Sequence, residues 1–265
     1  MPKFSIFILL FVFIFSFLGS FIYSIDATTL DSSSILLPPS VDHFLGTDRL
    51  GRDILARLME GGKVSLTIGA VSAFIASIIG LMFGATAGYF RGNVDKGLMV
   101  IIDLFLTFPT FFLLLTLISY VNASVWILIV IISITGWMTT ARLVRSESFK
   151  VTSQPFIKIL NIANVSKTKI LFKYYAPILA PIYFVSFTFG VGGAILAESA
   201  LSFLGLGIVA PQMSWGTILS EGKSVVEIAS WASFSPGLMI FLVTFSLINI
   251  SNYLQQLTNQ KQIQN

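Results

Sequence analysis

The sequence predicts an all-α polytopic membrane protein with six transmembrane helices. The chain has 265 residues, of which 55% are hydrophobic and only 11% are charged, and its mean hydropathy is +0.89. A soluble domain carries roughly 25% charged residues, so this chain has too few charges to cover a water-facing surface. Five long stretches carry no charge at all, and one of them is long enough for two crossings.

Charge-free stretches define the spans, because a helix needs about 20 mostly apolar residues to cross a bilayer. These stretches are 4–25, 64–90, 104–141, 174–197 and 228–260, and we divide the third at Asn122. The predicted organisation is an N-terminal transmembrane helix at 1–25, an external segment at 26–63, a core at 64–256 and a tail at 257–265. The core has helices at about 64–90, 97–120, 124–145, 174–198 and 233–256, with a polar segment at 146–173 and a cap at 199–232.

Two segments allow a second interpretation. The first apolar run could be a signal peptide, but it is longer than the usual apolar region and no A-x-A site follows it, so we expect a retained helix. The stretch 199–220 is free of charge yet contains Gly205, Gly207, Pro211 and Gly216. These residues favour irregular backbone, which lipid does not tolerate without protein cover. We therefore expect a re-entrant or external cap there.

The distribution of basic residues predicts the orientation. If the N-terminus is cytoplasmic, the inner segments hold eleven of the 16 basic residues, and the positive-inside rule then places both termini in the cytoplasm. The 146–173 segment becomes a cytoplasmic loop. The basic residues form no run, so the net charge of +4 indicates orientation and not nucleic-acid binding.

Catalysis and cofactor binding have little support in this sequence. The chain has no cysteine and one histidine, His43, which we interpret as a turn or capping residue. A thiolate or histidine metal site and a cysteine nucleophile are therefore excluded. No G-x-x-x-x-G-K-[ST] sequence occurs, so we expect the chain to bind neither nucleotide nor any other cofactor. Work driven by ATP would have to come from another polypeptide.

Small residues recur at every fourth position of the second predicted span. On a helix they form one stripe, which allows the backbone of another helix to approach closely. The pattern is equally compatible with packing inside the chain and with a subunit interface. The stripe consists of Ser72, Ala76, Gly80, Gly84 and Gly88, and Gly190 and Ala194 repeat the theme in the fifth span.

Asp103 is a carboxylate inside the third predicted span. Such a group is costly in a membrane and faces protein or water, which makes it a functional candidate. The alternative is a structural partnership with a basic side chain such as Arg142, and we favour this alternative. Pro109 follows in the same helix and is expected to kink it.

The segment 150–176 contains a predicted amphipathic helix outside the bilayer. Ile157, Leu160 and Ala163 recur at helical spacing, and Asn164 is expected to stop the helix, because asparagine tolerates the left-handed conformation. A second helical stretch at 167–175 should end before Pro177. The segment either lies on anionic headgroups or docks in a groove of a cytoplasmic partner.

Four sequence blocks resemble a known family, the C-type inner-membrane permease subunits of ATP-binding cassette importers for dipeptides, oligopeptides and nickel. Together they cover almost the whole chain, and each is long. The blocks are HFLGTDRLGRD at 43–53, continuing to Ser65; DLFLTFP at 103–109; Gly136-Trp137 with ARLVR at 141–145; and ESALSFLGLG at 198–207, with Ser214-Trp215-Gly216 and Pro236-Gly237. The resemblance marks Asp103, Pro109, Arg142, Arg145 and Glu198 as motif and pathway candidates.

The family also has a cytoplasmic coupling motif, E-A-A followed by a glycine, that docks on the ATPase subunit. By its spacing from Arg145 and Pro177, this motif falls here on Lys158, Ile159, Leu160 and Asn164. Lysine in place of glutamate reverses the charge, which predicts either a partner that has changed to match or a weakened importer; we favour the first. The predicted coupling segment comprises Phe156, Ile157, Lys158, Ile159, Leu160, Asn161, Ala163 and Asn164.

The resemblance implies a type I importer permease in the cytoplasmic (inner) membrane, working by alternating access. Its implied partners are a second permease subunit in a heterodimer, one or two ATP-binding subunits, an extracytoplasmic solute-binding protein and the lipid bilayer. In the outer region, Trp215 and Trp231 would contact the binding protein or cover the pathway. We expect Asp48, Arg49, Arg52 and Asp53 to satisfy one another in a structural element.

A different class of function is an ion-coupled secondary transporter that uses Asp103 and Glu198 as carriers. Against it, the sequence shows no inverted repeat and no matching pair of broken helices. A membrane enzyme would need convergent polar residues inside the bilayer, and the sequence shows none. Dipeptides, oligopeptides and nickel remain the alternatives for the solute.

Overall fold

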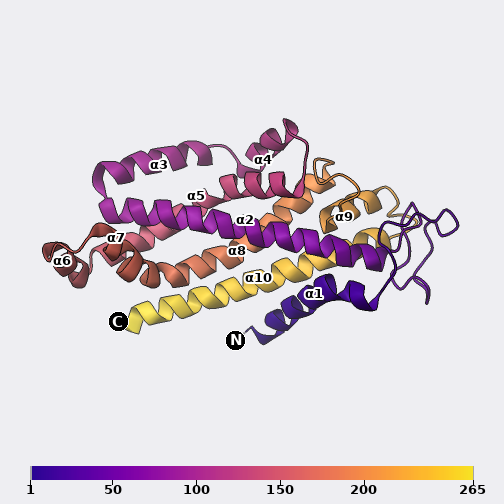
Figure 1. The fold of residues 1–265 in the computed structure, drawn as a ribbon, viewed down its shortest axis with the longest axis horizontal. Coiled ribbons are helices and arrows are strands. Elements are labelled where there is room, and N and C mark those ends of the chain that lie inside the picture. The colour runs from indigo at the N-terminus through magenta and orange to yellow at the C-terminus, as the bar shows by residue number, and fades with distance from the viewer. Residues whose placement is uncertain (1, 265) are drawn as a thin grey trace.

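A computed structural model describes residues 2–264, and the chain is mainly helical over that range (Figure 1). Its elements are α1 (Lys3–Ile22), α2 (Ile54–Phe90), α3 (Gly92–Leu106), α4 (Thr110–Ser119), α5 (Val125–Thr152), α6 (Pro155–Ile162), α7 (Lys167–Lys169), a π-helical stretch (Ile170–Tyr175), α8 (Ala176–Phe203), α9 (Trp215–Lys223) and α10 (Trp231–Gln264).

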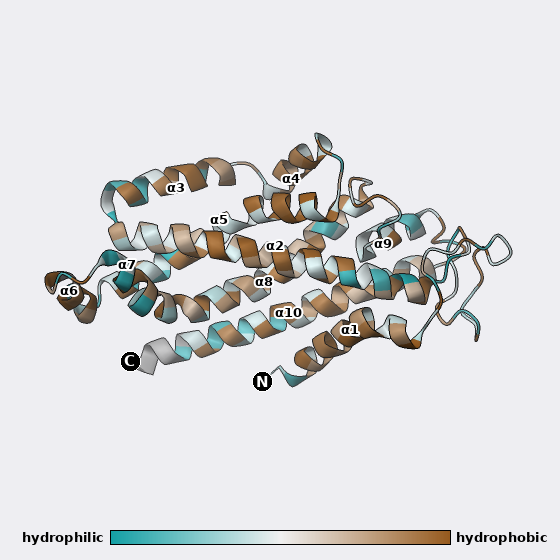
Figure 2. Ribbon diagram, in the orientation of Figure 1, coloured by the Kyte–Doolittle hydropathy of each residue, from teal (hydrophilic) through white to brown (hydrophobic). Residues whose placement is uncertain are grey.

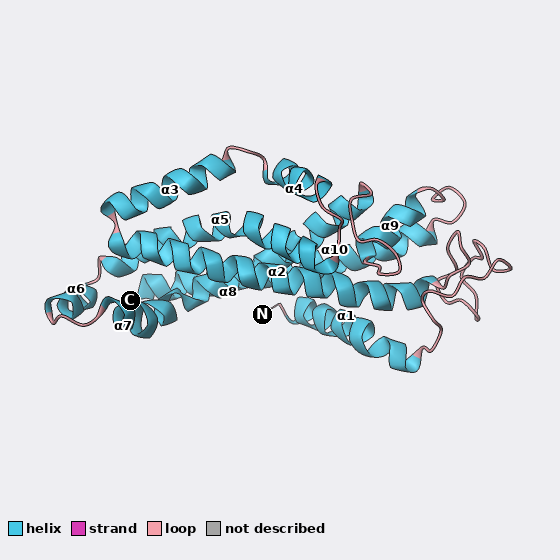
Figure 3. Ribbon diagram, turned by 45° about the horizontal axis from the view of Figure 1, so that its top comes forward, coloured by secondary structure: helices cyan, strands magenta, loops and turns pink. Residues whose placement is uncertain are grey.

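The long helices lie lengthwise beside one another and leave two different ends. α2 packs on α5 and α8, α8 packs on α10, and α1 packs on α2 and α10. One end of the molecule holds α6, α7 and the last turns of α10, and the other holds α9 and the loop between α1 and α2 (Figures 1 and 3). Figure 2 shows hydrophobic residues along the bodies of α1, α2 and α4. Hydrophilic residues lie near α7 and at the N-terminal end of α2.

Five helices are long and apolar enough to cross a membrane, and α3 with α4 makes a sixth span if this bent pair is counted as one. The predicted fold class is therefore confirmed. The single helix expected at 97–120 is instead two helices, bent by 75°. Pro109 lies at this break, because it lacks an N–H and disfavours helical backbone in the preceding residue.

Several helices extend beyond the predicted boundaries. α2 begins at Ile54 and not at residue 64, because Asp53 caps it by accepting a hydrogen bond of 2.8 Å from the Ala56 N–H. The charged residues at 57–63 lie within this helix, beyond its charge-free part. α8 continues to Phe203, and α10 runs through most of the predicted tail.

The helical stretch that begins at Lys167 does not end before Pro177, contrary to our expectation. It continues through the π-helical stretch into α8, and the whole segment Lys167–Phe203 forms one candidate span. A π-helical turn changes the hydrogen-bonding register next to the position where Pro177 lacks an N–H. The helix therefore accommodates the proline near its N-terminal end.

The small-residue stripe of α2 packs inside the chain, against α5. A Cβ atom added at Gly80 would lie 2.6 Å from Thr140 Cβ, and one at Gly88 would lie 2.3 Å from Ser148 Cβ. In α8, a Cβ atom at Gly190 would lie 3.3 Å from Ala73 Cβ. Of the two interpretations of the stripe, these close approaches favour packing inside the chain, because α5 already covers the glycines of α2.

Candidate functional site

A cavity of about 460 Å³ lies among α2, α5, α8 and α10, with Thr110 and Leu114 of α4 at its edge. Small, hydroxyl-bearing and apolar side chains line it, the large apolar ones being Leu114, Ile132, Leu143, Val185 and Phe189, and none of its lining residues is charged. The break at Pro109 places Thr110 in the lining, whereas Asp103, Arg142, Arg145 and Glu198 are not part of it. The polar lining residues are Ser72, Ser77, Thr110, Thr135, Thr139, Thr140, Ser186, Ser251, Asn252 and Gln255.

Such a lining offers hydrogen bonds without strong ionic attraction. Hydroxyl groups can both donate and accept, so they accommodate varied solutes in varied orientations. The glycines Gly136, Gly190 and Gly193 add backbone surface without side-chain bulk. The cavity therefore combines hydrogen-bonding groups with apolar surface and lacks the charged groups of a tight ionic site.

Glu198 is completely buried near the C-terminal end of α8. Its Oε1 atom accepts hydrogen bonds from Ser202 Oγ at 2.7 Å and from Ser214 Oγ at 2.6 Å. Ser214 is also the N-cap of α9 and accepts a hydrogen bond from the Thr217 N–H. Glu198 therefore links the end of α8 to the start of α9, and this geometry favours a structural role over that of an ion carrier.

Asp103 pairs directly with Arg142, as the structural interpretation of the sequence predicted. The ion pair joins α3 to α5, and both side chains are at least half exposed. Arg145 forms a second ion pair between the same helices, with Asp95, including a contact of 2.7 Å from Nη2 to Oδ2. The sequence analysis did not predict a role for Asp95. The available signal was its position in the first turn of the helix that follows Arg91.

The predicted coupling segment forms the projecting end of the molecule. Ile157 is fully buried against a cluster that includes Ile170 and Tyr175, and it anchors α6. Tyr175 Oη donates a hydrogen bond of 2.8 Å to the Ser148 carbonyl, which fixes this end to α5. Asn164 follows the helix with a φ of 53°, the left-handed conformation that the sequence predicted.

The other residues of this segment divide into half-buried and exposed ones. Phe156 and Leu160 are half-buried, whereas Lys158 and Ala163 are exposed. Ala163 lies beyond the end of α6 and does not extend its apolar face, contrary to the expected pattern. The apolar side chains Ile159 and Ile162 are exposed by 64% and 82%. The Asn161 side chain lies outside the described part of the structure.

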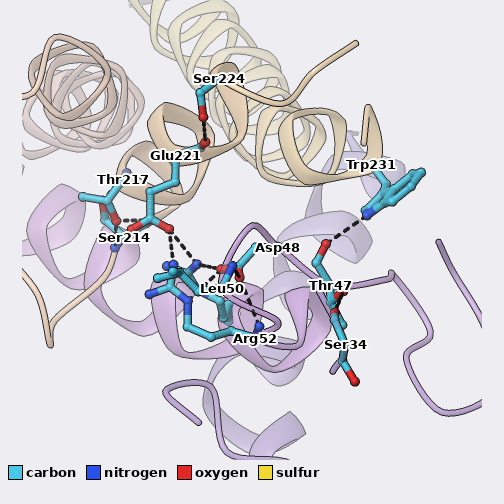
Figure 4. A network of polar contacts seen from close by, with 11 residues as sticks. Ser34, Thr47, Asp48, Leu50, Arg52, Ser214, Thr217, Glu221, Ser224 and Trp231 are labelled. Atoms are coloured by element: carbon cyan, nitrogen blue, oxygen red, sulfur yellow. Dashed lines mark hydrogen bonds and ion pairs between the residues drawn. The ribbon is translucent and has the colours of Figure 1, made fainter. Parts of the chain in front are cut away.

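A buried ionic network holds the opposite end together (Figure 4). Arg52 donates from Nε to Asp48 Oδ2 at 2.7 Å and from Nη2 to Glu221 Oε2 at 2.5 Å. Arg57 Nη1 bridges the same two carboxylates, with 2.6 Å to Glu221. Burial favours the neutral form of Asp48, but Arg57, backbone N–H groups and Arg52 hold the pKa of this carboxyl below its ordinary value.

This network corrects the expected pairing of the 43–57 block. Asp48 and Arg52 do pair, but Arg49 is exposed and has no ion pair within the described residues. Asp53 instead contacts His43 Nδ1 at 2.9 Å and accepts a hydrogen bond of 2.9 Å from Tyr23 Oη. The local sequence could not reveal Glu221, which is distant in the chain.

The expectation that Trp215 would contact a partner is wrong, because its side chain is fully buried. Its Nε1–H donates to the Leu58 carbonyl at 2.9 Å, and its backbone N–H donates to Ser65 Oγ at 3.0 Å. Trp231 is partly buried and donates to the Thr47 carbonyl at 3.2 Å, as Figure 4 shows. The Trp215 ring thus joins α9 to α2, and the Trp231 ring joins α10 to the loop between α1 and α2.

Comparison with known proteins identifies the family. Residues 80–262 match the model of the binding-protein-dependent transport system inner membrane component, which is more than half of the chain. The chain belongs to this family. Its members named below are permease subunits of transport systems, and the chain is accordingly a multi-pass membrane protein of an ATP-binding cassette importer.

Curated relatives match the chain over most of its length. It is 30% identical over 97% of its length to the oligopeptide transport system permease protein OppC of Haemophilus influenzae, of which it covers 83%. It is 32% identical over 97% of its length to the dipeptide transport system permease protein DppC of Bacillus subtilis, of which it covers 81%. It is 31% identical over 84% of its length to the nickel transport system permease protein NikC of Escherichia coli, again with 81% covered.

A solved structure shows the same fold. An inward-facing conformation of the MetNI methionine ABC transporter matches 75% of this chain and 96% of the matched chain, with a TM-score of 0.59 and 17% identity. The fold is thus that of a type I importer permease, as the sequence resemblance predicted.

Proposed function

We propose that this chain forms one half of a solute pathway in the cytoplasmic (inner) membrane, with a second permease subunit as the other half. The uncharged, hydroxyl-lined cavity among α2, α5, α8 and α10 is the observation that supports this proposal most directly. The solute would be a peptide or a related small solute such as a nickel chelate. An extracytoplasmic binding protein would select and deliver it, because the lining offers few selective contacts.

We further propose that the end with α6 and α7 docks on separate ATP-binding subunits. The 37 residues of α2, at about 1.5 Å each, extend for about 55 Å, whereas the hydrocarbon core is about 30 Å thick. The long helices therefore project well beyond the bilayer. Exposed Ile159 and Ile162 on a projecting helix suit a protein groove, and Lys158 beside them suits an acidic rim.

Coupling would then be mechanical. Ile157 and Tyr175 fix the coupling segment to α5 and α8, so a displacement of α6 would move the helices that line the cavity. ATP would drive alternating access if it bound more tightly to one conformation of the assembly than to the other. Both termini would lie on the cytoplasmic side, in agreement with the basic residues at this end.

The orientation provides the first test of this proposal, because the chain has no cysteine of its own. A Ser166→Cys variant should react with a membrane-impermeant thiol reagent only in inside-out vesicles, and an Arg49→Cys variant only in right-side-out vesicles. Both positions are exposed and form no ion pair within the described residues. Labelling of Ser166→Cys from outside would refute the proposal, because no cytoplasmic ATPase could then reach α6.

Purification from cells that express the whole transport system provides the second part of this test. The tagged chain should recover a second permease and one or two ATP-binding chains, and the complex should take up solute in an ATP-dependent manner. Recovery of this chain alone, stable and active in transport, would contradict the proposal. Dependence of uptake on an ion gradient alone would contradict it equally.

Charge reversal at Lys158 should uncouple ATP hydrolysis from uptake without affecting membrane insertion. Lys158 is exposed on α6, and against an acidic groove a Lys158→Glu variant would place like charges together. We expect uptake to fall about tenfold, corresponding to about 1.4 kcal/mol of lost docking free energy. The measurements are uptake per assembled complex and ATPase activity with and without the binding protein.

The matched control is Arg49→Glu, which makes the same charge change on an exposed residue at the opposite end. This control should leave coupling unchanged. If Lys158→Glu instead increases uptake, the partner groove is not acidic, and the chain is the weakened importer that the lysine also allows. Unchanged uptake with full assembly would remove Lys158 from the docking surface.

A further inference from the structure

Two ion pairs join α3 to α5, and they differ in geometry. Arg145 holds Asp95 through both carboxylate oxygens, and these side chains are 31% and 12% exposed. Arg142 holds Asp103 through Oδ1 only, and these side chains are 50% and 60% exposed. Within the described part of the chain, Asp103 Oδ2 and the Nε and Nη1 groups of Arg142 form no hydrogen bond. The second pair therefore has unused capacity to accept and donate.

Asp103 lies at a level where α3 is otherwise apolar. Its neighbour Ile102 is buried against Met138 and Ala141 of α5. On the other side, Leu104 is 64% exposed. An exposed leucine at this level suits lipid, whereas an exposed carboxylate inside a membrane faces water or protein. The Asp103 carboxylate is therefore expected to face water or protein and not lipid.

Arg142 lies beside cavity-lining positions of α5, although neither Arg142 nor Asp103 lines the cavity itself. Thr139, one helical turn before Arg142, and Leu143, directly after it, both line the cavity. None of the lining residues is charged. Asp103 and Arg142 are therefore the charged groups that a solute in the cavity would meet beside Thr139. The exposed side of the pair would then open toward the pathway.

We propose that Asp103 and Arg142 bind the charged termini of the solute during its passage. This inference rests on the proposed function as a permease for small solutes. The planar guanidinium of Arg142 would take a carboxylate through two parallel N–H groups, and Asp103 would take an ammonium group. A zwitterionic solute with both groups can replace the internal ion pair without leaving either charge unpaired. Unmodified peptides fit this requirement.

Cysteine accessibility tests whether the pair faces water. In the assembled transporter, with cysteine-free partner subunits, Asp103→Cys leaves Arg142 beside the thiol and should react about tenfold faster with an anionic than with a cationic methanethiosulfonate, relative to free cysteine. Arg142→Cys leaves Asp103 and should show the opposite preference. Leu104→Cys is the lipid-facing control and should not react with either reagent.

Labelling without any charge preference would overturn the inference, because Arg142 and Asp103 would then not set the local potential. Absence of labelling at both positions in the assembled transporter would also overturn it, since another subunit or lipid would then cover the pair. Labelling does not require uptake, whereas ATP-dependent uptake by the unmutated complex tests the proposed function. The two failures are thus distinguishable.

Competition between two peptides tests contact with the solute. The ratio of trialanine uptake to trialanine amide uptake should fall severalfold in Arg142→Gln, because only trialanine carries the terminal carboxylate. The same binding protein supplies every variant, so its own preference cancels when ratios are compared with the unmutated complex. Arg145→Gln, which removes the other arginine, should leave the ratio unchanged. An equal loss of both uptakes in Arg142→Gln would show a purely structural role and overturn the inference.

Discussion

An Arg57→Ala variant is expected to lose about 3–5 kcal/mol of stability, the usual effect of removing one partner from a buried ion pair. The Arg57 side chain is 2% exposed, and its Nη1 group bridges Asp48 and Glu221. Without it, Asp48 keeps Arg52, but Glu221 and Asp48 lie near each other with one positive charge fewer. Arg52 would still join the loop between α1 and α2 to Glu221 of α9, but α2 itself would lose its ion pairs with Asp48 and Glu221.

Thermal unfolding of the purified chain in detergent measures this effect, with Arg49→Ala as the matched control. Arg49 is an arginine of the same external segment, exposed and without an ion pair among the described residues. Its removal should change stability by less than about 0.5 kcal/mol, as for most surface substitutions. If the two variants unfold at the same temperature, the buried network does not stabilise the end of the molecule that holds α9 and the loop between α1 and α2.

The same network makes stability depend on pH. The folded-state pKa of Asp48 lies below its ordinary value, so the ionised form stabilises the fold above pH about 4. This contribution is lost as the pH falls from about 4 through the lower folded-state pKa. The unmutated chain should therefore lose stability as the pH falls through this window. The Arg57→Ala variant should lose less over the same window, because part of the contribution of Asp48 is already absent.

The spans and some local features were predictable from the sequence because they depend on short stretches of residues. Apolar runs long enough to cross a bilayer indicated all of the membrane helices. A carboxylate inside a span needed a partner, which pointed to Arg142. Asn164 was expected to end α6 because asparagine tolerates a positive φ, and its φ is 53°.

Features that depend on distant residues could not be predicted in this way. No local pattern connects Arg57 to Glu221, or Arg145 to Asp95, since packing of separate helices brings them together. The start of α2 was placed too late because we took the charged residues at 57–63 to lie outside the helix. Charged residues can continue a helix beyond its apolar part. Trp215 looked suited to an interface by its type, and only the tertiary fold shows that it is buried.

A Gly84→Leu substitution is the second change with a large expected effect, because α2 and α5 touch at this position. A Cβ atom at Gly84 would lie 2.5 Å from the Ala141 carbonyl oxygen and 3.0 Å from the Arg145 backbone nitrogen. Backbone atoms cannot move aside as a flexible side chain can. A single added methyl group in such a contact costs about 1–3 kcal/mol, and the larger leucine should prevent the close helix pairing altogether.

Gly97→Leu is the matched control, because a Cβ atom at this glycine of α3 would meet no atom within 4 Å. Both substitutions remove a helical glycine and should gain up to about 1 kcal/mol from helix propensity, so any difference between them comes from packing. We expect Gly84→Leu to yield little monodisperse protein in detergent and Gly97→Leu to yield a normal amount. Equal yields and unfolding temperatures would show that α5 does not hold α2 in this contact.

The smaller substitution Gly84→Ala tests whether the contact between α2 and α5 also matters for transport. It should fold, but α5 must shift away from α2 near Arg145, close to the end that carries α6. If coupling requires α2, α5 and α6 to move as one unit, this variant should hydrolyse ATP with reduced uptake per ATP, although its assembly is normal. Unchanged uptake per ATP in a folded Gly84→Ala complex would show that close α2–α5 packing serves stability alone and does not transmit motion to the cavity.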